Sequence, residues 1–400
     1  MSKSFQELGI SKEVLKSLES IGYTKPTEIQ EKAIPLAISG KDIVAQAQTG
    51  TGKTAAFGIP LVEKVNPKFK RIQALVLVPT RELAIQVTKE VKDLGKNKRV
   101  FVLAVYGGKS IKHQIDFLKK GSDVIVVGTP GRVRDLIERG HLGLESVNTL
   151  VLDEADRMLE MGFIEDIEFI MSNLPENRQN LLFSATMPRE ILELAEEFLK
   201  PDYETIKVKP DEVTVEKIRQ IVYRVSPSKL YETLKEVLSD YTSEKSIVFT
   251  QTKLEADKVA EKLQNDGFNA SAIHGDFSQN KRELVLKKFR TGELKILVAT
   301  DVAARGLDIK GVELVVNYKL PRDIESYIHR VGRTGRAGRE GTAISVITPE
   351  QDKVFIQIQK KINKKLEIIN SNPENFSQEK KQEKKSYKRS DRRPTAGRRR

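Results

Sequence analysis

The chain has 400 residues, of which 38% are hydrophobic and 31% charged, with a formal net charge of +13 and no cysteine. This length exceeds that of one ordinary hydrophobic core and predicts two domains, while the lack of cysteine excludes disulfides and thiolate metal sites. No apolar run reaches the roughly 18 residues of a membrane span, and the first residues lack the apolar centre of a signal peptide, so we expect a cytoplasmic protein.

Short apolar, β-branched runs alternate with amphipathic stretches of about 10 to 15 residues, which is typical of an α/β fold. Such runs are expected to form strands that are buried on both faces of a parallel sheet. Strands are predicted at residues 74–78, 100–105, 124–127, 149–152, 180–183, 246–249, 296–298 and 314–316. The pattern stops near residue 200 and restarts after residue 240, which predicts two α/β halves.

A polar stretch separates these halves. Residues 200–228 contain Pro201, Pro210 and Pro227 and resemble a domain connection. We therefore place the first domain at residues 1–207, a linker at 208–217 and the second domain at 218–369. From residue 370 the apolar content collapses and charge dominates, which predicts a disordered basic tail over residues 370–400.

In the first half, the segment AQTGTGKT at residues 47–54 follows the apolar run 43–45 and precedes a helical stretch. It has the pattern of a phosphate-binding P-loop, with alanine in place of the first glycine. Lys53 would reach the β- and γ-phosphates, and the Thr54 hydroxyl could bind Mg²⁺. The alternative is a glycine-rich turn without a ligand, but the strand–loop–helix context favours the P-loop. The residues expected to contact a nucleotide here are Ala47, Gln48, Thr49, Gly50, Thr51, Gly52, Lys53 and Thr54.

A P-loop predicts a carboxylate at the end of a buried strand, where it holds Mg²⁺. The run 149–152 leads directly into Asp153-Glu154-Ala155-Asp156. Asp153 fits the magnesium role, directly or through a water molecule, and Glu154 is placed to polarise an attacking water as a general base. The alternative for Asp153 is that it only caps the following helix.

These motifs, together with Ser184-Ala-Thr186 and HRVGRTGR at residues 329–336, resemble those of the DEAD-box RNA helicases and occur in the same order. The resemblance covers residues 4–365 and includes further motifs at residues 22–30, 79–84, 107–108, 129–132, 279–282 and 304–308. It implies two tandem RecA-like domains, each a mainly parallel sheet flanked by helices, which are joined by a flexible linker and bind ATP and RNA across the cleft. It also implies Mg²⁺ as cofactor and ATP-dependent, non-processive opening of short RNA duplexes, or remodelling of RNA–protein complexes.

The resemblance also points to residues around the base and ribose. The amide of Gln30 offers one donor and one acceptor, which match N7 and N6 of adenine and would favour ATP over GTP. A glutamine alone would more often be a solvated helix residue, but the surrounding motif at residues 22–30 reverses that. Phe5 and Tyr23 are available to pack near the base. By resemblance, Gly306 and Asp308 contact the nucleotide, with Asp308 at the ribose hydroxyls.

Several polar loops directly follow predicted strands, where α/β sheets bind ligands and helix N-termini offer free N–H groups to phosphates. By resemblance, these loops grip the backbone of one RNA strand without reading its sequence, and contacts to the 2′-hydroxyls would give a preference for RNA over DNA. For each threonine alone, a plain helix cap is the alternative. The residues expected to contact RNA are Thr80, Arg81, Gly108, Thr129, Arg132, Arg282, Thr300 and Asp301.

The resemblance also implies a set of coupling residues. Ser184 and Thr186 are expected to hydrogen-bond the acidic quartet, with His329 near Asp156, so that hydrolysis is coupled to domain closure. These roles concern coupling rather than direct catalysis.

The stretch HRVGRTGRAGR at residues 329–339 places four arginines at every third residue. On its own it would be interpreted as a basic turn that contacts RNA. By resemblance, Arg333 and Arg336 are arginine fingers for the γ-phosphate, which are typically worth about 10³ to 10⁵ in rate. Arg330 is expected to make a structural or interdomain contact, and Arg339 to be solvated.

The positive charge is concentrated at the end of the chain. Residues 379–400 hold 11 Lys and Arg against 3 Asp and Glu, which leaves 58 basic and 53 acidic residues elsewhere. This segment is either a solubilising tail or a tether that holds RNA near the core without sequence preference. Two other functions stay open, namely an RNA clamp or scaffold with little turnover and a DNA-directed helicase. Ribosome-assembly and RNA-decay proteins are candidate partners, and the sequence specifies neither the RNA target nor the oligomeric state.

Overall fold

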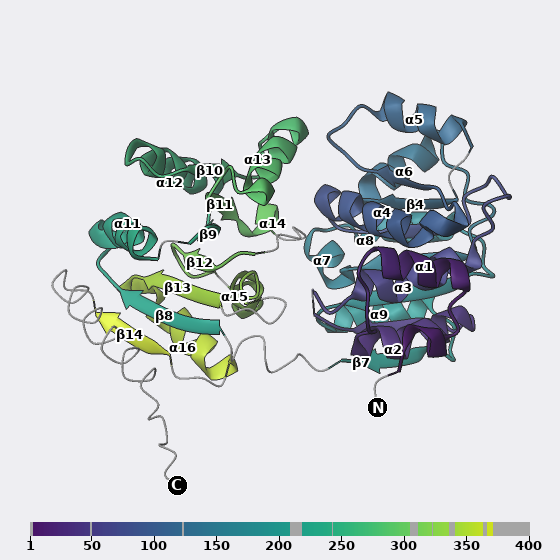
Figure 1. The fold of residues 1–400 in the computed structure, drawn as a ribbon, viewed down its shortest axis with the longest axis horizontal. Coiled ribbons are helices and arrows are strands. Elements are labelled where there is room, and N and C mark those ends of the chain that lie inside the picture. The colour runs from purple at the N-terminus through teal and green to yellow at the C-terminus, as the bar shows by residue number, and fades with distance from the viewer. Residues whose placement is uncertain are drawn as a thin grey trace, which may run out of the picture. The chain divides into compact units, whose positions relative to one another are not determined.

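The computed structural model describes residues 3–48, 50–121, 124–208, 218–241, 243–304, 311–321, 323–335, 341–362 and 366–370. The chain divides into two units, of which the first covers Met1–Glu212 and the second most of the chain from Val213 onward (Figure 1). We call them domain one and domain two and describe each by itself.

Domain one contains a seven-stranded sheet in which neighbouring strands pair in parallel, in the order β3-β4-β2-β5-β6-β1-β7. Parallel pairing follows from the chain's alternation of strands with helices, because each crossover returns the chain to the same end of the sheet. The strands are β1 (Ile43–Gln46), β2 (Ala74–Leu77), β3 (Val102–Val105), β4 (Ile125–Gly128), β5 (Thr149–Asp153), β6 (Gln179–Ser184) and β7 (Glu204–Lys207).

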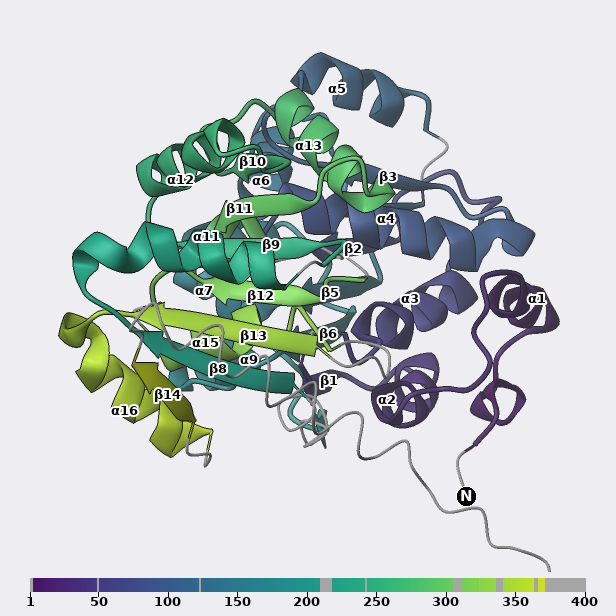
Figure 2. The ribbon, with the colours of Figure 1, turned by 60° about the vertical axis from the view of Figure 1, so that its left-hand side comes forward.

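Helices cover both faces of this sheet, so its central strands β2, β4, β5 and β6 are buried on both sides. Val76 of β2 packs in one core with residues of α3 and α4, whereas its neighbour Leu75 packs in a second core with residues of α6 and α8. On the first of these faces, α2 and α3 lie side by side (Figure 2). The helices are η1 (Phe5–Leu8), α1 (Lys12–Ser20), α2 (Glu28–Ile38), α3 (Lys53–Lys64), α4 (Arg81–Gly95), η2 (Lys96–Lys98), α5 (Ile111–Lys119), α6 (Pro130–Glu138), α7 (Ala155–Glu160), α8 (Ile164–Ser172) and α9 (Arg189–Phe198).

Domain two contains a second seven-stranded parallel sheet, in the order β10-β11-β9-β12-β13-β8-β14. Its strands are β8 (Ile218–Arg224), β9 (Ser246–Thr250), β10 (Ala270–Ile273), β11 (Ile296–Thr300), β12 (Leu314–Asn317), β13 (Gly341–Ile347) and β14 (Glu367–Asn370). Its helices are η3 (Pro227–Lys229), α11 (Leu230–Asp240), α12 (Lys253–Asn265), α13 (Gln279–Thr291), α14 (Asp301–Ala304), α15 (Ile324–Val331), η5 (Pro349–Gln351) and α16 (Asp352–Lys361).

The two sheets share one topology. If β8 to β14 are counted as first to seventh, their order in domain two is identical to that of β1 to β7 in domain one. The prediction of two α/β domains with parallel sheets is therefore confirmed, and the domains are related by fold although the sequence shows no repeat of short period.

The polar stretch at residues 200–228 is not a connection over its whole length. It contains β7 and β8, so the segment that joins the two sheets is shorter than that stretch. The composition was misleading because β7 is an edge strand, in which only Ile206 is buried while its other residues face solvent. An edge strand needs fewer apolar residues than a central one.

A buried carboxylate ties three segments of domain one together. Asp42, which directly precedes β1, is only 2% exposed. Its Oδ1 accepts a hydrogen bond from the backbone N of Asn180 at 3.0 Å, and its Oδ2 accepts one from the backbone N of Lys200 at 3.0 Å. The carboxylate therefore fixes the start of β6 and the chain after α9 against β1.

Replacement of this carboxylate should loosen that end of the sheet. We expect Asp42→Ala to lower the stability of domain one by about 2 to 4 kcal/mol, because two backbone N–H groups lose a buried carboxyl acceptor. Asp42→Asn, which keeps one acceptor oxygen, should lose less. Hydrogen exchange of the Asn180 and Lys200 amides in the full chain measures the effect. Unchanged exchange at both amides in Asp42→Ala would show that this node contributes little.

Candidate nucleotide and nucleic-acid sites

The P-loop connects β1 to α3. Gly50 and Gly52 adopt φ values of +89° and +92°, a left-handed conformation that glycine adopts at little cost. A Cβ on Gly52 would also lie 2.4 Å from Nε2 of Gln30, so this position excludes a side chain for reasons of both backbone and packing. The loop is thereby held close to the start of α2.

Lys53, the first residue of α3, carries a buried cation. Its side chain is 6% exposed, and its Nζ lies 4.0 Å from Oδ1 of Asp153. Among the residues that the structure describes, this Nζ has no hydrogen-bond partner. A buried ammonium without hydrogen bonds is unfavourable, and phosphate oxygens would satisfy it. The next residue, Thr54, brings its hydroxyl group to the same end of α3.

Asp153 ends β5, and its carboxyl group is buried. Burial raises its pKa to about 7, and the nearby Lys53 ammonium opposes that rise. Its Oδ1 also accepts a hydrogen bond from the backbone N of Glu154 at 3.0 Å. Because a divalent cation would favour the ionised form in this desolvated position, the donor set of Asp153 and Thr54 fits Mg²⁺.

Glu154 combines a strained backbone with an oriented carboxylate. It is one of two described non-glycine residues with positive φ, at +54°, a conformation that is uncommon for residues with a Cβ and recurs at functional sites. Its Oε2 accepts a hydrogen bond from Nη1 of Arg157 at 3.0 Å, and both side chains are buried. Arg157 was not among the residues predicted from the sequence, although its spacing of three residues from Glu154 in a helix is a signal for such a pair.

Asp156 links the acidic quartet to the end of β6. Its Oδ2 accepts hydrogen bonds from both the backbone N and Oγ1 of Thr186 at 2.8 Å, and its backbone N donates to Oγ of Ser184 at 3.2 Å. The hydrogen bonds expected between the quartet and these two residues are therefore present. Their role in coupling stays a prediction, and His329 lies in domain two.

Gln30 is buried and bonded within domain one. Its Oε1 accepts from the backbone N of Thr27 at 3.0 Å, and its Nε2 donates to the backbone O of Gly52 at 3.0 Å. The amide thus fastens α2 to the P-loop, in addition to the adenine contact expected of it. Phe5 and Tyr23 lie near each other, with ring centroids 6.2 Å apart.

The RNA-binding residues expected in domain one lie on the loops after β2, β3 and β4 or in the first turns of the helices that follow β2 and β4. The guanidinium of Arg81 rests against Gly108, where an added Cβ would lie 2.0 Å from its Nη1. Both terminal nitrogens of Arg132 donate to the backbone O of Lys109 at 3.4 Å. The hydroxyl of Thr80 caps α4. These contacts bring the three loops together at one end of neighbouring strands.

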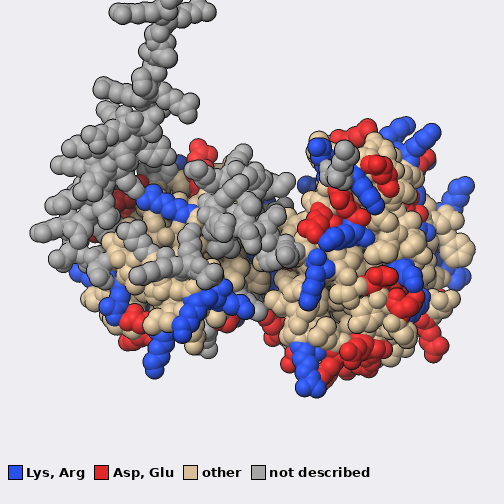
Figure 3. All heavy atoms as spheres, turned by 90° about the horizontal axis from the view of Figure 1, so that it is seen from below, with Lys and Arg blue, Asp and Glu red and all other residues tan. Residues whose placement is uncertain are grey.

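In domain one, the strand order separates the residues expected to bind the nucleotide from those expected to bind RNA. The acidic quartet, the Ser184–Thr186 segment and the P-loop follow β5, β6 and β1, which are adjacent in the sheet. The loops expected to bind RNA follow β3, β4 and β2, with Thr129 at the start of α6. Because carboxyl ends of parallel strands meet at one edge, nucleotide and RNA residues occupy neighbouring parts of the same edge. On the face drawn in Figure 3, basic and acidic side chains of this domain are interspersed.

In domain two, Arg330 is the most enclosed of the described arginines of the glycine-rich motif. Its side chain is 1% exposed, and its Nε and Nη2 bind the two carboxylate oxygens of Asp301 at 2.6 and 2.7 Å. Its Nη1 donates to Oδ1 of Asn317 at 3.2 Å and to the backbone O of Lys319 at 2.9 Å. The structural contact expected of Arg330 is confirmed. Since Arg330 occupies both oxygens of Asp301, an RNA contact of Asp301 would involve its backbone or depend on this pair.

The remaining candidates in domain two are partly described. Arg282 and Thr300 are buried, and Nη1 of Arg282 donates to the backbone O of His274 at 3.3 Å. Arg333 is buried as well, and its Nε donates to the backbone O of His329 at 3.2 Å. The predicted residues that lie outside the described part of the chain are Thr49, Gly306, Asp308, Arg336, Arg339, residues 209–217 of the linker and residues 371–400 of the tail. Asn370, which was also assigned to the tail, instead ends β14.

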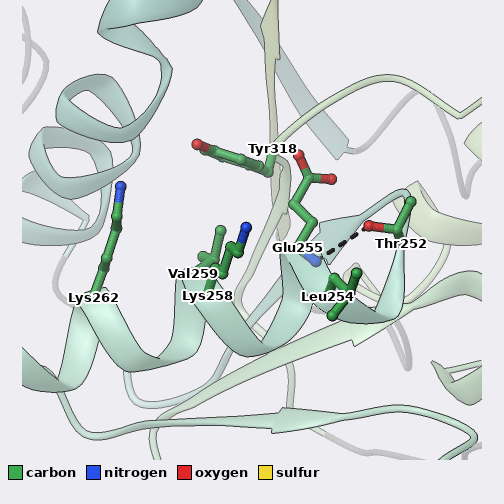
Figure 4. Close-up of a pocket in the computed structure, with 7 residues that line it drawn as sticks. All are labelled: Thr252, Leu254, Glu255, Lys258, Val259, Lys262 and Tyr318. Atoms are coloured by element: carbon green, nitrogen blue, oxygen red, sulfur yellow. Dashed lines mark hydrogen bonds between the residues drawn. The ribbon is translucent and has the colours of Figure 1, made fainter.

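A hollow of about 290 Å³ lies along α12 in domain two. Leu254, Lys258 and Lys262 line it from the helix, and Tyr318 faces them from the end of β12 (Figure 4). The carboxylate of Glu255, at its rim, accepts from Nζ of Lys319 at 2.6 Å. The hollow contains none of the residues that the sequence analysis singled out.

Two parallel sheets of identical strand order, with a P-loop on the first, define a tandem RecA-like ATPase. Residues 27–194 match the family model of the DEAD/DEAH box helicases, and residues 229–338 match that of the helicase conserved C-terminal domain. The chain is 54% identical over 364 residues to the DEAD-box ATP-dependent RNA helicase CshA of Geobacillus kaustophilus, which covers 91% of this chain and 78% of that protein. It is 50% identical over 367 residues to CshA of Bacillus subtilis, with coverages of 92% and 74%. The chain belongs to the DEAD-box ATP-dependent RNA helicases.

Solved structures agree with this assignment. Dbp5 of S. cerevisiae bound to RNA and ADP BeF3 has a TM-score of 0.84 at 35% identity, covering 96% of this chain and 99% of that chain. Mss116p bound to ssRNA and AMP-PNP has a TM-score of 0.82 at 31% identity, with coverages of 92% and 79%. The described residues include no helix that is long and apolar enough to cross a membrane.

The Arg330–Asp301 pair should stabilise domain two rather than act on ATP. We expect Arg330→Ala to destabilise this domain by about 3 to 5 kcal/mol, because it leaves a carboxylate and a carbonyl without their buried partner. The matched control is Arg224→Ala, whose ion pair with Asp352 is partly exposed and should contribute about 1 kcal/mol or less. Hydrogen exchange of amides in β11 and β12 measures the difference. Equal protection in both variants would contradict the structural role.

Proposed function

We propose that this helicase hydrolyses ATP at the carboxyl edge of the first sheet and grips one RNA strand with loops of both domains. Closure of the two domains then bends the RNA and opens short duplexes locally and without processive movement. The observation that carries the proposal is the buried Lys53 ammonium, which lies beside Asp153 and has no hydrogen-bond partner among the described residues, next to an oriented Glu154.

The P-loop residues bind the phosphates in this proposal. The N–H groups of residues 47–54 surround them, and the Lys53 ammonium donates to the β- and γ-phosphates. Among the described residues, this ammonium has no hydrogen-bond partner that would compete with the phosphates. Thr54 and Asp153 would hold Mg²⁺, which supplies charge neutralisation at the phosphates when bound. Gln30 recognises adenine while it keeps α2 fastened to the loop.

Glu154 acts as the general base in this proposal. Arg157 holds its carboxylate, so the group is oriented before the water arrives. The carboxylate accepts a proton from the attacking water as the water oxygen bonds to the γ-phosphorus and the bond to the β–γ bridging oxygen breaks. Burial keeps other waters from competing for this carboxylate.

RNA binding is proposed to use mainly backbone contacts. Thr80, Arg81, Gly108, Thr129 and Arg132 would contact one part of the strand from domain one. In domain two the contacts would come from Arg282, Thr300 and Asp301. Dbp5 and Mss116p were both solved with RNA, which supports RNA as the partner of this chain. Such contacts position RNA without selecting a sequence, so a specific transcript is not expected from the core alone.

Arg333 and Arg336 are proposed to complete the ATP site when the domains close. The hydrogen bonds from Ser184 and Thr186 to Asp156 would transmit closure to the acidic quartet, with His329 as their partner on domain two. ATP hydrolysis would then require RNA, because RNA and ATP together favour the closed state. The proposed location is the cytoplasm, and the candidate protein partners are those of ribosome assembly or RNA decay.

Removal of the base should separate binding from hydrolysis. We expect Glu154→Gln to slow ATP hydrolysis by about 10²- to 10⁴-fold while ATP and RNA binding persist, because the amide keeps the shape but accepts no proton. Single-turnover hydrolysis with bound RNA measures the rate, and Glu165→Gln on the exposed side of α8 is the control. Normal turnover in Glu154→Gln would refute the assignment of the base.

Two arginines of one motif offer a matched comparison. We expect Arg336→Ala to slow hydrolysis by about 10³-fold or more and to spare RNA binding in the absence of ATP. Arg339→Ala should change neither quantity, since Arg339 is expected to be solvated. Loss of RNA binding together with hydrolysis in Arg336→Ala would instead indicate an RNA-contacting turn.

A further inference from the structure

The loop between β10 and α13, residues 274–278, needs support from side chains. β10 is the edge strand of the second sheet, so the chain that leaves it has a strand neighbour, β11, on one side. This loop leads into α13, whose first turn contains Arg282. The position of that arginine therefore depends on how the loop is fixed.

Two side chains of α12 hold the loop. Oδ1 of Asp257 lies 2.9 Å from Nε2 of His274, and Nζ of Lys253 lies 2.6 Å from Oδ1 of Asp276. Lys253 and Asp257 are four residues apart and thus lie on one face of the helix. The Lys253 pair is largely exposed and contributes little, whereas the His274 ring is buried. Asp257 therefore makes the stronger of the two attachments.

The His274 ring is buried although only one of its two nitrogens has a hydrogen-bond partner among the described residues. It packs against the Phe277 ring with centroids 4.3 Å apart. On Phe277 in turn, Nζ of Lys281 lies 3.6 Å from the ring centroid. The residue is 4% exposed, yet its Nδ1 has no hydrogen-bond partner among the described residues. A buried polar atom without a partner is unfavourable, so stability alone does not account for a histidine here.

The backbone of His274 connects this attachment to Arg282. Its carbonyl O accepts from Nη1 of Arg282 at 3.3 Å and from the backbone N of Phe277 at 3.2 Å. The ring of His274 is bonded to Asp257, and the backbone carbonyl of His274 is bonded to the guanidinium of Arg282. His274 thus links the carboxylate of Asp257 to Arg282.

We propose that His274, held by Asp257, is a positioning residue that keeps Arg282 oriented toward the RNA phosphate backbone. The proposal rests on the RNA-binding role of Arg282 given above. It adds that RNA affinity of domain two depends on an attachment made outside the RNA-binding loops. Neither His274 nor Asp257 contacts RNA or ATP in this scheme.

Replacement of Asp257 tests the proposal with little risk to folding, because its carboxylate is half-exposed. We expect Asp257→Ala to raise the RNA concentration for half-maximal ATPase activity about fivefold, the effect of one ordinary hydrogen bond. The kcat at saturating RNA and the KM for ATP should stay unchanged. Asp257→Asn should restore most of the affinity, because its amide oxygen still accepts from Nε2. Glu261→Ala, four residues further along α12 and exposed, is the matched control.

A double-mutant cycle separates this inference from the proposed function. If His274 acts through Arg282, adding Asp257→Ala to Arg282→Ala should cause no further loss of RNA affinity. Additive losses, or an Asp257→Ala variant with normal RNA affinity, would overturn the positioning role while Arg282 keeps its own. If Arg282→Ala itself left RNA affinity unchanged, the proposed RNA contact of Arg282 would fail and the inference with it.

Discussion

The arrangement of this molecule depends on burial of opposite charges at the carboxyl edge of a parallel sheet. Lys53 and Asp153 are both nearly inaccessible to water, yet their charged atoms stand 4.0 Å apart rather than in a hydrogen bond. Burial is the main cause that raises the pKa of Asp153 to about 7, against the opposing effect of the Lys53 ammonium. A polyphosphate with a divalent cation would supply hydrogen-bond and ionic partners for both groups.

The same strand order in both domains determines where each set of residues lies. In domain one it places the P-loop, the acidic quartet and the Ser184–Thr186 segment on adjacent strands, and the loops proposed to bind RNA on the strands beside them. In domain two the corresponding edge carries Arg282 and Thr300, while the Arg330–Asp301 pair fills the space between β11, β12 and α15. Under the proposed function, identical topology serves nucleotide chemistry in domain one and RNA contacts with arginine fingers in domain two.

The sequence was sufficient for the fold class and for most central strands, because fully apolar runs between helices leave few alternatives. It was insufficient for β7, β8, β10, β13 and β14, which were not among the predicted strands. Of these, β7 and β8 have a polar or mixed composition that resembles a connection. The P-loop and acidic motifs could be assigned chemistry from residue types alone. The bonds from Arg157 to Glu154, from Gln30 to Gly52 and from Asp257 to His274 could not, because they depend on distances across the fold.

The central claim is that ATP hydrolysis by this chain requires RNA. The most direct test is steady-state ATP turnover by the full chain at saturating ATP, with saturating single-stranded RNA, with DNA of the same sequence, and without nucleic acid. The account predicts strong stimulation by RNA, and little by DNA, because 2′-hydroxyl contacts favour RNA. Turnover that is equal in all three conditions, or equally stimulated by DNA, would contradict it.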